Sequence, residues 1–139
     1  MKLRSAAFAA LAGSLLVLPS LSRPAQAEDL VEDTAVLQGL DKITGRVMTI
    51  EAPVGTPVHF GTLEIIVRTC RKRPPEESPE SAAFLDVWEI RTGEPAASIF
   101  RGWMFASSPA LSALEHPVYD IWVLDCENSA AKGSAPKSQ

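Results

Sequence analysis

Residues 100–126, FRGWMFASSPALSALEHPVYDIWVLDC, contain two of the three Trp, the only Tyr and one of the two Cys. The pattern predicts a strand, a short helical corner and a second strand that ends at a cysteine. We expect the corner at Ser108–Glu115, with Ser108 as the N-cap and Pro109 at the first helical position. This block predicts a hydrophobic core and a cross-link, and it contains no signature of a reaction.

Short segments rich in β-branched and aromatic residues precede this block, and Gly and Pro separate them. One strand is expected from Ala35 to the turn at Asp41–Lys42, and the others at residues 45–51, 58–60, 63–70, 82–91, 97–106 and 118–126. With one helical corner and one disulfide, they predict an all-β fold, either a small antiparallel sandwich or a partly open barrel. Val118–Cys126 has apolar residues on both parities, which predicts a central strand buried on both faces.

The N-terminus has the features of a secretory signal peptide. Lys2 and Arg4 precede an apolar run, and Ala25–Ala27 forms a small-x-small cleavage pattern. A transmembrane anchor is disfavoured because the run is shorter than the roughly 20 residues that a span requires. We therefore expect cleavage after Ala27, location in the periplasm and no stable membrane insertion afterwards.

Removal of residues 1–27 leaves 112 residues, enough for one domain. We expect an acidic leader at 28–34, a β domain at 35–127 and a disordered tail at 128–139. Three of the 13 basic residues leave with the signal segment, so the mature net charge is about −7. Such a charge argues against a nucleic-acid partner, because affinity for phosphates requires basic side chains.

Two cysteines in an exported chain predict a disulfide. Pairing Cys70 with Cys126 would close a loop of about 57 residues, which the chain-entropy model values at about 4 kcal/mol. Cys70 lies on the more polar parity of its strand, together with Ile66. Either its sulfur reaches inward at the strand end, or another segment covers that face. The following segment, Arg71–Ser81, has three prolines and is expected to be a loop or lid.

Several long motifs carry a resemblance to a known family: Val36–Arg46 (VLQGLDKITGR), Phe60–Glu64 (FGTLE), Cys70, Ala83–Leu85, Gly102–Pro109 (GWMFASSP), Glu115–Asp120 (EHPVYD) and Cys126. With them the chain resembles the exported bacterial family catalogued as domain of unknown function 2155. The likeness covers about Ala35–Asn128. It implies an envelope protein of Gram-negative bacteria with no assigned activity, and it supplies no catalytic residues.

The chain contains residue types used in catalysis, but not in the sequence motifs that mark a catalytic site. Ser107 or Ser108, His116 and Asp120 have the composition of a triad, but the G-x-S-x-G elbow is missing. The structural interpretation makes Ser108 a cap and His116 a hydrogen-bonding partner in the corner. Paired carboxylates for glycoside hydrolysis could come from four acidic residues: Asp86, Glu89, Asp120 and Asp125.

Metal and cofactor sites are not indicated. His59 and His116 stand alone without ligand spacing, and neither a phosphate-binding glycine loop nor a dinucleotide fingerprint is present. We therefore expect neither a metal nor a cofactor.

A binding surface is the remaining candidate site, beside the helical corner. It would use Trp103, Phe105, His116, Tyr119 and Asp120, although core packing explains each of these residues as well. The leading hypothesis is a non-enzymatic module that binds or scaffolds an unknown envelope protein or polymer. The alternative is a small envelope-polymer hydrolase that uses His116 with a carboxylate.

Overall fold

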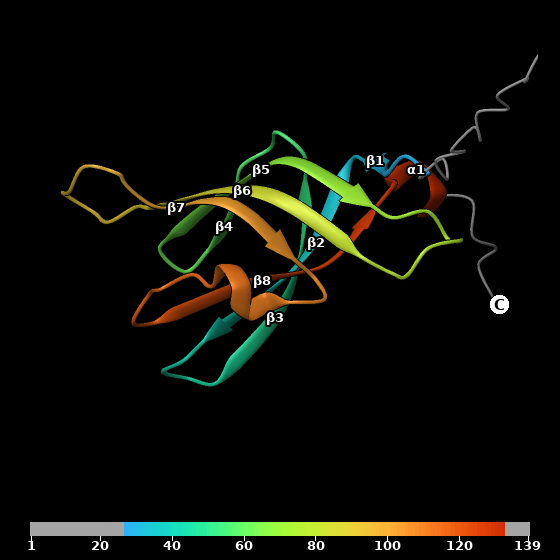
Figure 1. Ribbon diagram of the computed structural model, residues 1–139. Coiled ribbons are helices and arrows are strands. Elements are labelled where there is room, and N and C mark those ends of the chain that lie inside the picture. The colour runs from blue at the N-terminus through green and yellow to red at the C-terminus, as the bar shows by residue number, and fades with distance from the viewer. Residues whose placement is uncertain (1–26, 133–139) are drawn as a thin grey trace, which may run out of the picture.

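The computed structural model describes residues 27–132. Residues 1–26 of the predicted signal segment and the tail residues 133–139 lie outside the described residues. Strands dominate the described chain (Figure 1). In chain order the elements are β1 (Leu30–Glu32), β2 (Thr34–Asp41), β3 (Arg46–Pro53), β4 (Val58–Phe60), β5 (Leu63–Lys72), β6 (Ser81–Glu89), β7 (Ala97–Phe105), the 3-10 helix η1 (Pro109–Ser112), β8 (Tyr119–Glu127) and the short helix α1 (Ser129–Lys132).

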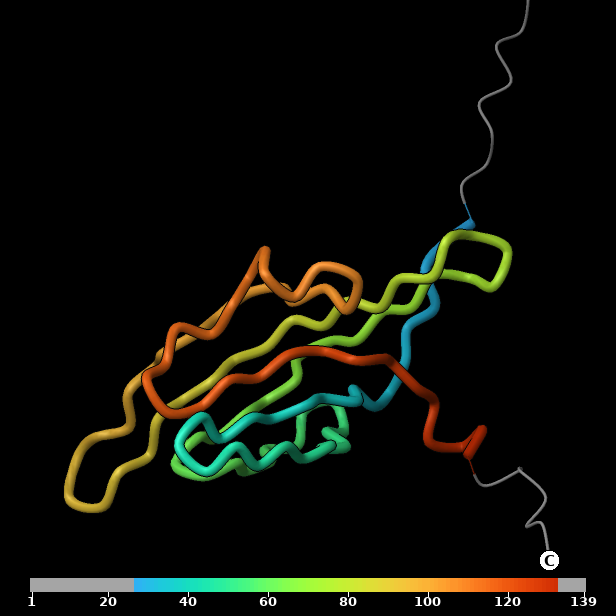
Figure 2. Tube along the Cα trace, turned by 90° about the horizontal axis from the view of Figure 1, so that it is seen from below, coloured from blue at the N-terminus to red at the C-terminus, as the bar shows by residue number. Residues whose placement is uncertain are grey.

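The strands form two antiparallel sheets. The larger sheet has the order β1-β5-β6-β7, with β4 also paired to β5, and the smaller sheet has the order β3-β2-β8. Figure 1 shows the two sheets as separate layers, and in Figure 2 the strands of the smaller sheet run across the larger one. Both sheets are open, so the all-β antiparallel fold is confirmed and the sandwich is the form observed.

The two sheets bury one apolar core between them. In β5, Leu63, Ile65 and Val67 are fully buried, whereas Glu64 and Ile66 are partly exposed, as the alternation predicts. Burial of each large aliphatic side chain contributes about 1.5 to 3 kcal/mol. Further core residues come from both sheets: Ala35, Leu37, Ala52, Phe60, Cys70, Ala83, Leu85, Val87, Met104, Ile121, Val123 and Cys126.

Two β-bulges bring the cysteines to the core. The pairing of β5 with β6 shifts between Val67 and Thr69, which leaves Arg68 as the extra residue. The pairing of β8 with β2 shifts in the same way and leaves Leu124 as the extra residue. A bulge reverses the parity of everything that follows it. Because of the bulge at Arg68, Cys70 points into the core. Of the two possibilities stated above, the sulfur therefore reaches inward, and no other segment has to cover the outer face of the strand at this position.

The cysteines join the two sheets. Cys70 in β5 and Cys126 in β8 form a disulfide with a Cα–Cα distance of 5.7 Å, within the usual range. Both are fully buried, and each lies opposite a buried alanine, Ala83 for Cys70 and Ala35 for Cys126. The predicted pairing is therefore present as a connection between the layers.

Several local expectations differ from the structure. β8 is an edge strand rather than a central one, because the central strand of the smaller sheet is β2. Within the predicted acidic leader, residues 28–34, Leu30–Glu32 form the strand β1 and pair with β5. The tail begins with α1, where the hydroxyl and the N–H of Ser129 bond to Asp33 at 2.7 and 2.9 Å.

The corner after β7 contains the helix η1 and follows the prediction in part. Ser108 occupies the N-cap position and Pro109 begins the helix, but the Ser108 side chain makes no capping hydrogen bond. In the described part of the chain, no helix has the length and apolar character needed to cross a membrane.

Candidate functional site

Two of the predicted binding residues lie on the outer face of the larger sheet. Met104, between Trp103 and Phe105 in β7, is 2% exposed and belongs to the core, so its two neighbours point away from the core. The Trp103 ring meets the Phe84 ring edge-on, with centroids 5.7 Å apart. The other three predicted residues lie in or just before β8, which belongs to the smaller sheet. The predicted surface is therefore divided.

His116 is part of a filled corner and is only 7% exposed. Its Nδ1 accepts hydrogen bonds from the backbone N–H groups of Val118 and Tyr119 at 3.1 and 3.0 Å. In the neutral ring the proton must then be on Nε2, which donates to Oε1 of Glu89 at 3.0 Å. The ring also stacks on Tyr119, with centroids 5.3 Å apart. All hydrogen-bonding capacity of His116 is used to hold the corner together.

This arrangement does not assemble a hydrolytic site. The hydrogen bond from His116, with that from Arg91, lowers the pKa of Glu89 below its ordinary value, despite an opposing contribution from burial. Glu89 is therefore an ionised acceptor. Ser107 bonds to Glu80 instead of His116. A general base needs a free lone pair directed at a substrate, and His116 has none.

Asp120 is not a buried carboxylate, although it lies between the apolar side chains of Tyr119 and Ile121 in β8. It lies opposite Leu40 in the ladder between β8 and β2 and is partly exposed. Among residues 27–132 the buried carboxylate is Asp86, which is 2% exposed and lies on the outer side of β6. Asp86 therefore requires partners for its buried charge.

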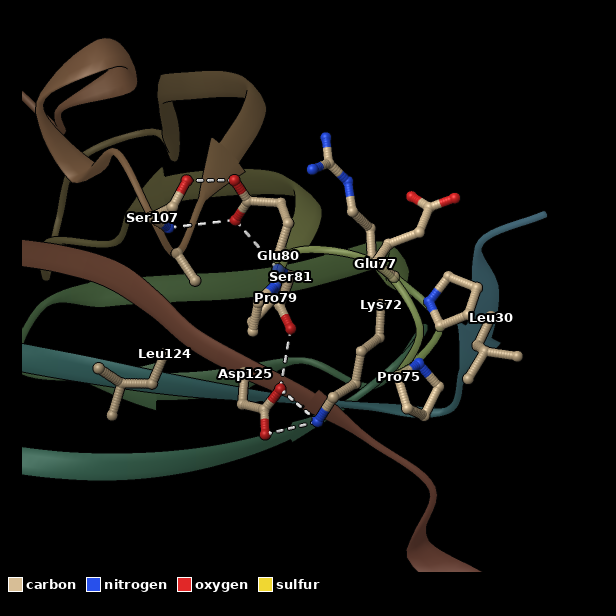
Figure 3. Close-up of a pocket in the computed structure, with 13 residues that line it drawn as sticks. Leu30, Lys72, Pro75, Glu77, Pro79, Glu80, Ser81, Ser107, Leu124 and Asp125 are labelled. Atoms are coloured by element: carbon tan, nitrogen blue, oxygen red, sulfur yellow. Dashed lines mark hydrogen bonds and ion pairs between the residues drawn. The ribbon is translucent and has the colours of Figure 1, made fainter. Parts of the chain in front are cut away.

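A groove of about 430 Å³ lies between the proline-rich loop, residues 73–80, and the end of β8 (Figure 3). We call it the proline-loop groove. The Arg73 N–H donates to the Glu80 carbonyl at 2.9 Å, and the Glu77 N–H donates to the Pro74 carbonyl at 3.0 Å. These bonds close the loop, and its prolines restrict the backbone further. The loop predicted from composition is thus one wall of the groove.

The polar floor of the groove is centred on Asp125. Lys72 Nζ lies 2.8 and 2.9 Å from the two carboxylate oxygens, and the Ser81 hydroxyl donates to Oδ1 at 2.8 Å. Partial burial raises the pKa of Asp125, but the hydrogen bonds from Lys72, Ser81 and the Cys126 N–H outweigh it and leave the pKa below 3.8. These polar groups satisfy one another and fix the floor (Figure 3).

Glu80 connects the loop to the chain that follows β7. Its Oε1 accepts from the N–H groups of Ser81 and Ser107 at 3.0 and 3.1 Å, and the Ser107 hydroxyl bonds the other oxygen. Partial burial raises the pKa of Glu80. These hydrogen bonds and the nearby Arg73 outweigh that effect, so the pKa lies below the ordinary value of 4.5. The loop is therefore held against Ser107 by an ionised carboxylate.

The apolar part of the groove comes from residues that the sequence analysis did not select. Leu30 in β1 and Leu124 in β8 are 45% and 40% exposed, and both line the groove with Pro74, Pro75 and Pro79. Leu124 was missed because alternation gives no warning of a bulge. The signal that could have revealed the bulge is that Val123 and Cys126, three residues apart, both have to reach the core, which a regular strand does not allow.

Metal ligation is not supported by the side chains of the described range. Across residues 27–132, no three His, Cys, Asp or Glu side chains gather in a way that could hold a metal ion. The arrangement around the proline-loop groove is suited to holding an apolar group against a fixed polar floor.

The fold and the site together define an antiparallel β-sandwich domain with a groove at one end of its sheets. Residues 35–126 match the family model described as "Uncharacterized protein conserved in bacteria (DUF2155)". The chain belongs to this family, and the resemblance drawn from its motifs is confirmed.

A curated relative is "Uncharacterized protein RP359" of Rickettsia prowazekii (strain Madrid E). It is 32% identical over 87 residues, which cover 63% of this chain and 56% of the relative. The chain thus matches just over half the length of that protein. No solved structure matches the chain.

Proposed function

We propose that this protein is an exported, non-enzymatic module that binds or scaffolds another component of the bacterial envelope from the periplasm. The signal-like N-terminus with its cleavage pattern at Ala27 supports export. The pairing of Cys70 with Cys126 supports an oxidising compartment, because disulfides persist there.

The observation that carries the binding role is the proline-loop groove. Its volume of about 430 Å³ lies within the range of ligand sites, about 300 to 1,000 Å³. Exposed leucines are usually isolated on a protein surface, but Leu30 and Leu124 line one concavity together with prolines. Such a combination of apolar walls and rigid backbone is typical of a recognition site.

The chemistry of the groove favours an extended apolar segment of a partner protein. Lys72, Ser81 and Asp125 already satisfy one another, so a ligand gains little by replacing these bonds. The exposed area of Leu30 and Leu124 is not satisfied in this way, and covering it contributes roughly 25 cal/mol per Å². The partner is therefore expected to insert aliphatic or aromatic side chains beside Leu124.

The test is photo-crosslinking in the periplasm with a photoreactive amino acid at Leu124. The matched control is Leu111 in η1, which is 75% exposed but does not line the groove. We expect a specific adduct from position 124 and none from position 111. The adduct should be identified by mass spectrometry, and the purified partner should bind the protein but not its Leu124→Asp variant.

Equal adducts at both positions, or no adduct at position 124, would refute binding in the groove. Hydrolysis of purified murein by the protein would refute the non-enzymatic role.

A further inference from the structure

The outer face of the larger sheet carries a second cluster, unrelated to the groove. Across the strands, Phe84 of β6 pairs with Trp103 of β7, and Asp86 pairs with Arg101. Trp88 follows on the same side of β6, since Leu85 and Val87 point into the core. Together with Arg68 these residues form what we call the aromatic-arginine face.

Asp86 holds two cations on this face. Its Oδ2 lies 3.0 Å from Nη2 of Arg68 and 3.8 Å from Nη1 of Arg101. The carboxylate is 2% exposed, whereas the side chains of Arg68 and Arg101 are 49% and 66% exposed. One buried negative charge thus positions two guanidinium groups whose remaining N–H donors are open to solvent. Asp86, Arg68 and Arg101 together carry a net charge of about +1, and Glu64, opposite Trp88 on the same face, is hydrogen-bonded to His59 at 3.2 Å.

The second oxygen of Asp86 is also informative. Oδ1 is buried and has no hydrogen-bond partner within residues 27–132. A buried acceptor without a donor is costly, because the desolvation of that oxygen is not offset by a hydrogen bond. A ligand that brings donors as well as acceptors can reorganise the two exposed arginines and satisfy this oxygen.

We propose that the aromatic-arginine face binds a glycan strand that carries carboxylate groups. Sugar rings present apolar C–H faces that cover the flat faces of Trp88 or Trp103. Their hydroxyl groups act as both donors and acceptors, and carboxylates form paired hydrogen bonds with guanidinium groups. An apolar protein surface would leave the exposed N–H donors of Arg68 and Arg101 without acceptors, so the glycan fits the chemistry better.

The test is co-sedimentation of the purified protein with insoluble murein sacculi, whose glycan strands carry carboxylates on their peptide stems. Trp103→Ala removes a stacking ring, and Arg101→Ala removes the more exposed cation. The matched control for the ring is Trp122→Ala, because Trp122 lies on the outward side of β8 in the other sheet, between buried Ile121 and Val123. Arg46→Ala, at an exposed position of β3, is the control for charge.

We expect the apparent Kd for sacculi to rise at least tenfold in Trp103→Ala and in Arg101→Ala, and to stay unchanged in both controls. Binding should weaken as ionic strength rises, since the arginines are solvent-exposed, and uncharged chitin should bind more weakly than sacculi. Circular dichroism melting establishes that each variant is folded, and Arg101→Ala removes a side chain that is not part of the core.

The proposal is overturned if wild-type protein does not sediment with sacculi, or if control and test variants lose binding equally. It is also overturned if protease treatment of the sacculi abolishes binding, because the occupant would then be a protein. Crosslinking at Leu124 reports on the groove alone, so failure of either proposal is recognised independently of the other.

Discussion

The disulfide provides the most direct test of the fold. Cys70 and Cys126 are 56 residues apart in the sequence and connect the two sheets at fully buried positions. Reduction of this bond keeps both sulfur atoms in the core, whereas a Cys70→Ala/Cys126→Ala double variant also removes them. The two perturbations therefore separate the effect of the cross-link from the effect of packing.

The expected magnitudes follow from the geometry. Closing a loop of this length lowers the entropy of the unfolded chain by an amount worth about 4 kcal/mol at 25 °C. Replacement of the buried sulfurs leaves small cavities opposite Ala35 and Ala83, for which we expect a further loss of about 1 kcal/mol. We expect the m-value to increase when the bond is broken, because the unfolded chain then exposes more surface.

The assay is urea unfolding followed by far-UV circular dichroism and tryptophan fluorescence, for the oxidised protein, the reduced protein and the double variant. Adding reductant to the double variant is the control and should change nothing. A difference of less than about 1 kcal/mol between oxidised and reduced protein, with an unchanged m-value, would contradict the cross-link between Cys70 and Cys126.

Three further predictions concern the groove, a turn and the corner. The pKa of Asp125 in the folded protein lies below 3.8. The ionised carboxylate therefore stabilises the fold fully above that pH, and this contribution is lost as the pH falls through the lower folded-state pKa. In an acid titration of unfolding, the stability of Asp125→Asn should depend less on pH than that of wild type. Gly61→Ala places a Cβ against the Tyr119 ring at a φ of +58°, whereas Gly93→Ala at +79° has open space around it. Urea titrations should therefore show a larger loss of unfolding free energy for Gly61→Ala, by about 1 to 3 kcal/mol. Equal losses would refute this contact. His116→Ala should lower the free energy of unfolding by about 2 kcal/mol, because a carboxylate and two N–H groups lose their partner, and a loss below about 0.5 kcal/mol would refute the structural role.

Much of the fold is predictable because single segments carry its signals. The alternation of Leu63, Ile65 and Val67 places one face of β5 in the core, and Pro and Gly mark the turns around it. The disulfide partner was equally constrained, since each cysteine has one possible partner in the chain. The strand and the turns depend on local sequence and the pairing depends on the number of cysteines, so all three could be predicted.

The order of strands and the candidate site were harder to predict from the sequence. β8 is apolar on both parities, which predicted a central strand, but in the structure it is an edge strand with Leu124 exposed to the groove. The predicted binding residues are close together in sequence. In the structure His116 is part of a filled corner, whereas Trp103 lies on the outer face of the larger sheet. Sequence proximity could not predict this, because which face a residue occupies depends on pairing with distant strands.

The two bulges relate the interior of the domain to both proposed binding surfaces. In a regular strand, residues three apart point to opposite faces, yet the residue three before each cysteine shares the core with it. One extra residue in each strand makes this possible, and that residue is turned outward: Arg68 reaches the aromatic-arginine face, and Leu124 lines the proline-loop groove. Deleting Arg68 or Leu124 would restore strict alternation and place the cysteine two positions after the buried valine, so Cys70 or Cys126 would still face its partner. A one-residue deletion should therefore leave the disulfide intact and remove only the outward side chain, Arg68 from the aromatic-arginine face or Leu124 from the proline-loop groove.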